Sequence, residues 1–339
     1  MAKFLKAKEK FKERISVGLD MGTNAIKIVK LRFFKEGTEL SAFEIEPSQL
    51  DVASALKRLK NSLGEIDGVN LSASGSSTVI RYVEFPRMSS EELKQSLKFE
   101  AQKHIPFSIG EVNLDGNILK PDLPDNKMLV LVAAAKKELV KQRLKLIEDA
   151  GMKPNLIDID SIALMNAFNF NYAQDETLQH KTVALLNIGG AVTNLDIMED
   201  GIPRLSRDIH IAGNNITNKI KDIFAVDFGT AENLKLNPTS EKANKVTVAL
   251  ESVLTNLAAE IRTSFDYYES QSASSVAKIF LSGGTSKFNG LKEILTNFLG
   301  IEVEHWDPLK QISLPGKLDA QKVKASSGQL AVAVGLALR

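Results

Sequence analysis

The 339-residue sequence contains no cysteine, only four histidines and a single tryptophan. Without cysteine the chain can form no disulfide framework, thiolate nucleophile, thiolate zinc site or iron–sulfur cluster. The histidines His104, His180, His210 and His305 show no i, i+4 pairing and no adjacent carboxylate motif, which argues against a zinc site. The GxSxG pattern of a serine hydrolase is also missing.

An excess of charge is lacking as well, and so are long apolar runs. Lys and Arg total 43 against 42 Asp and Glu, and basic residues do not alternate with aromatic ones, so nothing in the composition favours nucleic acid. The longest apolar runs, such as residues 330–338, fall well short of the roughly 20 residues of a membrane span. Lysines interrupt the N-terminus where a signal peptide would be apolar, so we expect a cytoplasmic protein.

The first 14 residues form a basic segment with two glutamates among the basic side chains. Phe4, Leu5 and Phe11 are interspersed with these charges, a composition compatible with a short amphipathic helix at a membrane surface. A solvated terminus is the alternative reading.

Two segments of the chain share one pattern, an apolar strand, a glycine turn and a second strand. They are residues 15–31, ISVGLDMGTNAIKIVKL, and residues 182–198, TVALLNIGGAVTNLDIM. Superposing Asp20 on Asn187, 167 residues apart, places Gly22 on Gly189. A repeat at this separation predicts two similar halves that face each other across a cleft.

Other segments have the periodicity of helices and buried strands. The first half contains predicted helices at residues 89–104 and 136–150 around a strand at 128–135, then a strand at 155–159, a helix at 161–168 and a polar linker at 171–180. The second half contains predicted helices at 216–224 and 246–270, a charged polar stretch at 231–245, a strand at 277–282 and a helix from Gly290. Small residues recur in the tail, residues 327–339, so a helix there can pack closely on a neighbour.

Three glycine turns follow apolar strands, at Gly22, at Gly189 with Gly190, and at Gly283 with Gly284. Glycine lets backbone N–H groups converge on an anion, although tight hairpins use it too. The GxxxxGK[ST] and GxGxxG fingerprints are missing, which disfavours a P-loop NTPase and a Rossmann dehydrogenase.

The first turn also carries side chains suited to a nucleotide. Asp20 could hold hydrated Mg²⁺, Thr23 and Asn24 add donors, and Lys27 adds positive charge. The alternatives are a turn-capping role for Asp20 and a solvated position for Lys27.

The segments DMGTNAIK, NIGGAVTN and FLSGGTSKFNGL resemble the phosphate 1, phosphate 2 and adenosine motifs of the actin-like ATPase superfamily. RYVEFPRMSSEELKQSLKFEAQKHIPF, VAAAKKELVKQRLKLIEDAGMKP and GIPRLSRDIHIAGNNIT closely resemble the PilM family of type IV pilus assembly proteins, which are relatives of FtsA. The resemblance extends from about Ile15 to the end of the sequence.

This resemblance implies an α/β, actin-like, two-lobed fold made of duplicated RNase H-like domains, with an FtsA-like 1C subdomain as an insert. The implied boundaries are a basic segment at 1–14, subdomain 1A at 15–86, the 1C insert at 87–154, 1A and a linker at 155–181, lobe 2 at 182–326 with subdomain 2B at about 215–272, and a helix at 327–339 that returns to 1A.

The resemblance also implies a site for ATP and Mg²⁺ between the lobes, with Asp20 as the metal residue, through water. The implied nucleotide-binding residues are Asp20, Gly22, Thr23, Asn24 and Lys27 from one lobe, Asn187, Gly189, Gly190 and Thr193 from the other, Gly213, Asn214, Glu232 and Lys235 at the nucleoside, and Gly283, Gly284 and Thr285 beneath the adenosine. Because Glu232 and Lys235 are three residues apart, a surface ion pair is the alternative reading.

Asn187 departs from the superfamily pattern, in which an aspartate helps to organise Mg²⁺ and water. Because an amide supplies no negative charge, we expect ATP binding with at most slow hydrolysis. Asp160 could substitute as a group that orients water, or it could simply cap the helix that begins near it.

The function that the resemblance implies is that of a cytoplasmic scaffold, peripheral at the inner membrane, for pilus assembly and twitching motility. It would bind the cytoplasmic N-terminal peptide of PilN in a groove between 1A and 1C, with the predicted helix 89–104 and residues 105–107 as one wall, and homo-oligomers are possible. The alternatives are a polymer-forming ATPase of the FtsA or MreB kind and a sugar kinase of the same fold. A secretion protein of the GspL kind would normally carry a transmembrane segment.

Overall fold

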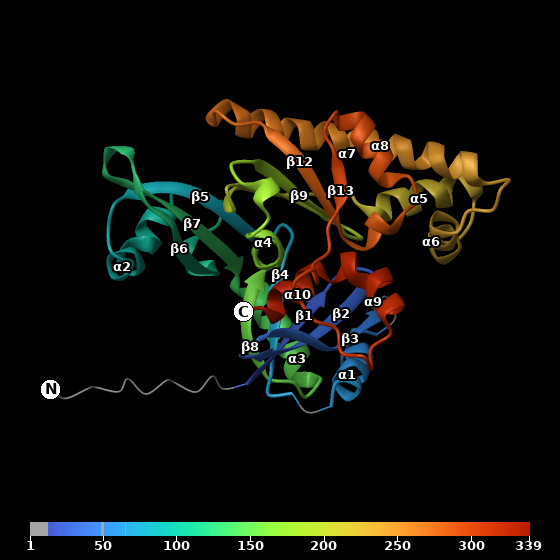
Figure 1. Ribbon diagram of the computed structural model, residues 1–339, viewed down its shortest axis with the longest axis horizontal. Coiled ribbons are helices and arrows are strands. Elements are labelled where there is room, and N and C mark those ends of the chain that lie inside the picture. Colours follow the sequence, from blue (N-terminus) through green and yellow to red (C-terminus); the bar gives the residue numbers. More distant parts are fainter. Residues whose placement is uncertain (1–12, 49–50, 65) are drawn as a thin grey trace.

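The computed structural model describes residues 13–48, 51–64 and 66–339, so the basic N-terminal segment, whether helix or solvated terminus, lies mostly outside this range. Two five-stranded sheets and one three-stranded sheet form the framework of the molecule (Figure 1). Within the described residues, no helix is both long and apolar enough to cross a bilayer.

Lobe 1 is built on the first five-stranded sheet, ordered β3-β2-β1-β4-β8. The strands are β1 (Arg14–Met21), β2 (Ala25–Phe34), β3 (Gly37–Pro47), β4 (Val69–Ala73) and β8 (Pro154–Ile159). Helices α1 (Val52–Ser62) and α3 (Lys137–Asp149) pack on it, and their Leu56 and Ile147 join Leu19 and Ile28 in one apolar core.

Lobe 2 repeats this plan in the order β11-β10-β9-β12-β13. The strands are β9 (Thr182–Ile188), β10 (Thr193–Glu199), β11 (Ile202–Ile209), β12 (Val276–Ser282) and β13 (Val303–His305), and the helices are α5 (Gly213–Phe224), α6 (Phe228–Leu236), α7 (Ala243–Gln271) and α8 (Leu291–Leu299). In both lobes the first three strands are antiparallel and the last two continue in parallel, so the sheets have matching topology. The predicted repeat of two similar halves is confirmed.

The third sheet is an insert, with the order β5-β7-β6, and stands to one side of both lobes (Figure 1). Its elements are β5 (Thr78–Pro86), α2 (Ser90–Ala101), β6 (Val112–Leu123) and β7 (Lys127–Lys136). A capping box starts α2, because the Ser89 hydroxyl accepts from the Glu92 N–H and the Glu92 carboxylate accepts from the Ser89 N–H. The first strand of this sheet begins at Thr78, ahead of the boundary expected at residue 87. Helix α3, which lies within the range expected for the insert, contributes instead to the core of lobe 1.

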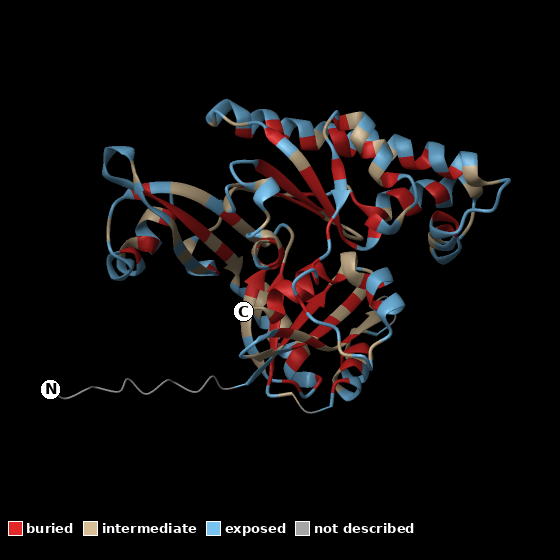
Figure 2. Ribbon diagram, in the orientation of Figure 1, coloured by how far each residue is buried: buried red, intermediate tan, exposed pale blue. Residues whose placement is uncertain are grey.

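Two helices, α4 (Asp160–Tyr172) and α10 (Ala331–Ala337), lie between the two large sheets, where buried residues concentrate (Figure 2). They approach so closely that a Cβ on Gly335 would lie 1.7 Å from the Ala163 carbonyl oxygen. A Cβ on Gly18 of β1 would likewise lie 2.0 Å from the Ala333 oxygen. The small residues of the tail therefore allow three backbones to pack together. The remaining elements are α9 (Ala320–Ser326) and five short 3-10 turns: η1 (Ile109–Glu111) and η2 (Pro124–Asn126) in the insert, η3 (Glu176–Leu178) after α4, η4 (Gly284–Lys287) after β12, and η5 (Ser327–Leu330) before α10.

One stretch differs from the sequence prediction. Residues 231–245 were expected to be a charged, polar segment, yet α6 covers Phe228–Leu236 and buries Ala231, Leu234 and Lys235. The reason is that the Lys235 ammonium finds polar partners inside the lobe, which a hydropathy pattern does not show. The tryptophan is a core residue as expected, since Trp306 is buried beside Phe168 and Tyr172.

Candidate functional site

The strand ends of the two sheets bring the predicted nucleotide residues into one region, which we call the turn cluster. It comprises residues 20–24 of lobe 1 and 189–190, 213–214 and 283–285 of lobe 2. In lobe 1 the buried Asp20 carboxylate is 2.9 Å from the Lys27 Nζ, directly across the β1–β2 ladder. A Cβ on Gly22 would lie 2.7 Å from that Nζ, so glycine leaves room for the lysine side chain.

In lobe 2 the glycine turns are tied to one another through backbone groups. The Gly213 N–H donates to the Gly189 oxygen over 3.0 Å, and the Asn214 N–H donates to the Gly190 oxygen over 2.7 Å. The Thr285 hydroxyl donates to the same Gly189 oxygen over 2.8 Å. The start of α5 is thereby fastened to the turn after β9.

The third turn is equally close-packed. Gly283 has φ +97°, and a Cβ there would lie 2.3 Å from the Ile188 oxygen, so only glycine fits. The Gly283 N–H donates to Gly328, whereas Gly284 is exposed. The structure therefore brings Gly283 and Thr285 against the turn that follows β9.

Asn24 and Asn214 join the two lobes directly. The Asn24 Nδ2 donates to the Asn214 Oδ1 over 2.7 Å, and Gly190 packs so tightly beside Asn24 that a Cβ would lie 2.8 Å from its Cγ. The lobes are thus in contact at the turn cluster.

Glu232 and Lys235 form an ion pair in which the lysine is buried and the glutamate is partly exposed, and not a surface pair. Lys235 is only 3% exposed, and its Nζ lies 2.7 Å from Glu232 Oε2 and 3.0 Å from the Thr217 hydroxyl. Burial lowers the pKa of Lys235, although the hydrogen bond and charge of Glu232 oppose this shift. Because Gly213 lies beside the lysine, the group sits next to the turn cluster.

Asn187 lies in a ladder of side-chain hydrogen bonds across lobe 2. Its Nδ2 donates to Asn194 Oδ1 over 3.0 Å, and its Oδ1 accepts from the Ser282 hydroxyl over 3.2 Å. Asn194 Nδ2 then donates to Asp208 Oδ1 over 2.8 Å, and Asp208 Oδ2 accepts from the Gly75 N–H over 3.0 Å. We name Ser282, Asn187, Asn194, Asp208 and Gly75 the amide ladder. The sequence analysis missed Asn194, although it lies 167 residues after Lys27, the separation of the repeat.

Asp160 approaches Asp20 from the start of α4. Burial and then the negative charge of Asp20 raise the pKa of Asp160 to about 7, against hydrogen bonds with Ser72 and Ser74 and the charge of Arg143. Asp160 is the first residue of α4 and not its cap, which is Ile159. Its carboxyl group therefore lies near the Asp20 carboxylate of the turn cluster.

Two predicted threonines differ in exposure. Thr193 is fully buried and its hydroxyl donates to the Ile211 oxygen over 2.7 Å, so this hydroxyl is used inside lobe 2. Thr23 is exposed in the β1–β2 turn.

The turn cluster has the chemistry that a nucleotide with Mg²⁺ requires. Lys27 and Asn24 offer donors for phosphate, the glycine turns keep Cβ atoms out of the way, and Asp20 and Asp160 place two carboxyl groups together. Among the described residues, no group of three or more His, Asp or Glu could hold a metal by itself. The residues therefore fit a hydrated ion that is shared with phosphate oxygens better than an all-protein site.

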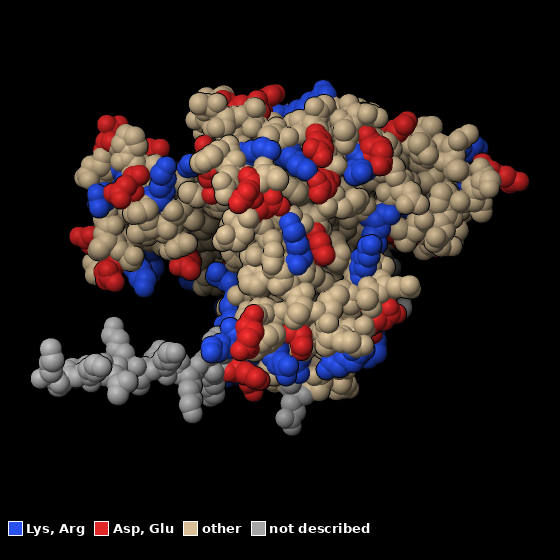
Figure 3. Space-filling view, in the orientation of Figure 1, with Lys and Arg blue, Asp and Glu red and all other residues tan. Residues whose placement is uncertain are grey.

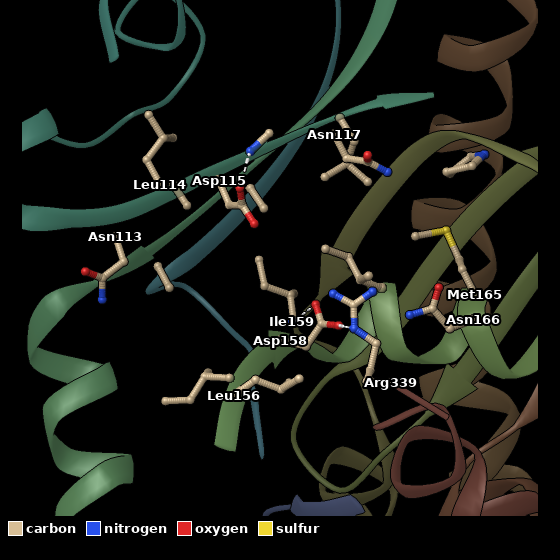
Figure 4. Close-up of a pocket in the computed structure, with 18 of the residues that line it drawn as sticks. Asn113, Leu114, Asp115, Asn117, Leu156, Asp158, Ile159, Met165, Asn166 and Arg339 are labelled. Carbon is tan, nitrogen blue, oxygen red and sulfur yellow. Dashed lines mark hydrogen bonds and ion pairs between the residues drawn. The ribbon is translucent and has the colours of Figure 1, made fainter. Parts of the chain in front are cut away.

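A second feature is a groove of about 860 Å³ between the insert and the lobes (Figures 3 and 4). Its walls are the edge strands β6 and β8, the central insert strand β7, helix α4 and the β10–β11 hairpin at residues 201–203. The expected wall, residues 89–107, does not line it. Helix α2 instead buries Leu93 and Leu97 in the core of the insert, while Pro106 and Phe107 line a separate cavity.

Apolar and polar residues line the groove in similar measure, and three of the polar side chains, Asp158, Asn166 and Arg339, lie at its floor (Figure 4). Asp158 is ion-paired with Arg339 over 2.9 Å between Oδ2 and Nε. Burial raises the pKa of Asp158, and the Arg339 charge opposes this rise. Asn166 also faces the groove, and its buried Nδ2 has no hydrogen-bond partner among the described residues. The floor thus offers an unused donor.

Comparison with known proteins places the chain in a family. A family model described as "Type IV pilus assembly protein PilM" matches residues 18–339. A chain in a solved structure of a PilM–PilN type IV pilus biogenesis complex is 26% identical, with a TM-score of 0.85 over 96% of this chain and 98% of that chain. The ethanolamine utilization protein EutJ from Carboxydothermus hydrogenoformans is 15% identical, with a TM-score of 0.58 over 96% and 89%, which reflects the fold alone.

Proposed function

Because the chain belongs to the PilM family of type IV pilus assembly proteins, we propose that it is an ATP-binding scaffold that binds the cytoplasmic N-terminal peptide of PilN. In this role it acts in the cytoplasm, peripheral at the inner membrane, and links its nucleotide state to pilus assembly and twitching motility. The observation that carries the peptide-binding part is the groove, which lies between the insert and lobe 1.

The groove suits an extended peptide. The free edges of two sheets, β6 of the insert and β8 of lobe 1, both border it, so unpaired backbone groups are available on either side. Apolar side chains such as Ile162 and Met165 line its length and would take up apolar side chains of the peptide. The Asn166 amide would donate to a polar group of the peptide that enters with them.

The turn cluster supports ATP binding. Lys27 would neutralise phosphate charge, Asn24 and the glycine turns would donate to phosphate oxygens, and Asp20 with Asp160 would hold water around Mg²⁺. Bound Mg–ATP would supply the charge that these residues balance. The Asn24–Asn214 hydrogen bond would open on entry, so nucleotide binding would change the contact between the lobes.

Hydrolysis is expected to be slow at most. Asn187 is occupied on both sides of its amide, by Asn194 and Ser282, and an amide cannot take a proton from water at neutral pH. Asp160 remains as the carboxyl group able to orient water. A scaffold that changes shape with its nucleotide needs little turnover.

Titration calorimetry tests both binding functions. ATP–Mg and a synthetic peptide with the sequence of the PilN N-terminus are each titrated into the purified chain. Ala133→Phe, which fills the groove from β7, should abolish peptide binding and leave ATP binding intact. Ala259→Phe, on an exposed face of α7, is the matched control. Peptide binding that survives Ala133→Phe would place the peptide elsewhere.

A further inference from the structure

The β10–β11 hairpin reaches both candidate sites. At one end, Thr193 and Asn194 stand beside the turn cluster, and at the other, Gly201 and Pro203 line the groove. The Gly201 oxygen also accepts a hydrogen bond from Asn169 Nδ2 of α4 over 3.0 Å. Since both strands of the hairpin are paired along their length, a displacement at one end is passed to the other.

The same hairpin is bonded to the insert. The Tyr82 hydroxyl of β5 lies 2.7 Å from the Ser206 hydroxyl of β11, and Ser206 donates to the buried Asp196 over 2.5 Å. Either hydroxyl can be the donor in the Tyr82–Ser206 bond. A second bond runs from the Gly75 N–H, in the loop that leads into β5, to Asp208 of the amide ladder.

We propose that these two hydrogen bonds, Tyr82–Ser206 and Gly75–Asp208, form an interlock through which the nucleotide state at the turn cluster sets the width of the groove. The chain connects the insert to lobe 1, whereas the interlock connects it to lobe 2. A movement of lobe 2 must therefore drag the insert or break the interlock.

Movement of the insert changes the groove, because β6 and β7 form one wall while β8 and α4 form the other. The movement would begin at the amide ladder, because Asn187 at one end lies next to the predicted phosphate turn. At the other end, Asp208 is bonded to Gly75 in the loop that leads into the insert. In this view Asn187 is a positioning residue whose amide passes on the state of the turn. The effect of nucleotide on peptide affinity rests on the proposed function, whereas the mechanical link between lobe 2 and the insert does not.

The first test measures coupling. The affinity for the synthetic PilN peptide is determined by calorimetry with and without saturating ATP–Mg, and the ratio of the two is the coupling factor, typically about 5- to 150-fold in allosteric proteins. Tyr82→Phe removes one hydroxyl and with it one hydrogen bond of the interlock. The loss of one such bond should bring the coupling factor about fivefold closer to one. Combining Tyr82→Phe with Asp208→Ala should bring the factor to one.

Two matched control variants test whether a change in the coupling factor is specific to the interlock. Tyr267→Phe and Asp222→Ala alter the same residue types at exposed positions of α7 and α5 and should leave the factor unchanged. A wild-type factor of one with both ligands bound would overturn the coupling and leave the proposed function standing. An unchanged factor in the Tyr82→Phe, Asp208→Ala variant would overturn it as well.

The second test needs no peptide. Since the chain has no cysteine, Lys94→Cys on α2 and Glu251→Cys on α7 give a clean pair of spin labels for distance measurement between insert and lobe 2. The distance distribution should be narrow in the labelled parent and broader once Tyr82→Phe and Asp208→Ala are added. Equal distributions would show that the interlock does not hold the insert, whether or not either ligand binds.

Discussion

Replacement of Gly335 by alanine tests whether helices α4 and α10, which lie between the two large sheets, really meet through backbone contact. Helix propensity alone favours alanine by about 1 kcal/mol. The structure predicts the opposite, because the new Cβ would lie 1.7 Å from the Ala163 oxygen, where no real Cβ is found, and α4 or α10 would have to move by more than an ångström. Overpacking typically costs about 1–3 kcal/mol, and a contact this short falls at the upper end, so after the gain in helix propensity we expect a net loss of up to about 2 kcal/mol.

Urea unfolding followed by tryptophan fluorescence measures this loss. Trp306 is the only tryptophan and lies in the same apolar cluster as Ala333 and Val334 of α10, so it reports on the region that is perturbed. The midpoint should fall for Gly335→Ala, whereas Gly110→Ala, where a Cβ meets open space, should stay within about 0.5 kcal/mol of the parent. A midpoint for Gly335→Ala at or above the parent value would refute the close approach.

Three further predictions concern the polar sites. Lys27→Met should weaken ATP binding at least about tenfold by calorimetry, because it leaves the Asp20 charge uncompensated beside phosphate; an unchanged affinity would remove Lys27 from the site. Asn187→Asp should raise phosphate release, since it restores a carboxylate, and a rate no higher than the parent's would show that this amide is not what limits hydrolysis. Burial raises the pKa of Asp196 to about 7, so its share of the unfolding free energy is present below about pH 4 and lost as the pH rises through 7. In the parent, this loss lowers the free energy of unfolding by roughly 2–4 kcal/mol between pH 5 and 8. Asp196→Asn should therefore flatten this decline in urea unfolding experiments; a decline equal to the parent's would exclude Asp196 as its source.

Local patterns in the sequence predict much of this fold. The strand–glycine–strand repeat predicts two matching sheets, and the Ser89 signal predicts the start of α2, because each depends on neighbours in the chain. The sequence pattern did not predict helix α6, because Lys235 is buried through hydrogen bonds to polar partners on α5 and on α6 itself. The predicted helix 89–104 does not line the groove between the insert and the lobes, because α2 has one apolar face and the core of the insert uses that face.

Of the candidate site, the glycines could be predicted and the side-chain bonds could not. Asp20 and Lys27 face each other on adjacent strands, a relationship that the hairpin alone implies. The contact of Asn24 with Asn214 joins residues 190 positions apart, and that of Gly75 with Asp208 joins different lobes. Such contacts depend on how whole sheets are placed, and no local pattern records them.

The repeat has a consequence for tracing the ancestry of the two halves. At equivalent positions, lobe 1 joins β1 to β2 through Asp20 and Lys27, and lobe 2 joins β9 to β10 through Asn187 and Asn194. The two halves thus use an ionic bond in one sheet and a neutral one in the other at the same position of the repeat. A search that demands an aspartate at each half would pass over this chain, whereas one that demands a bonded pair at each half would recover both.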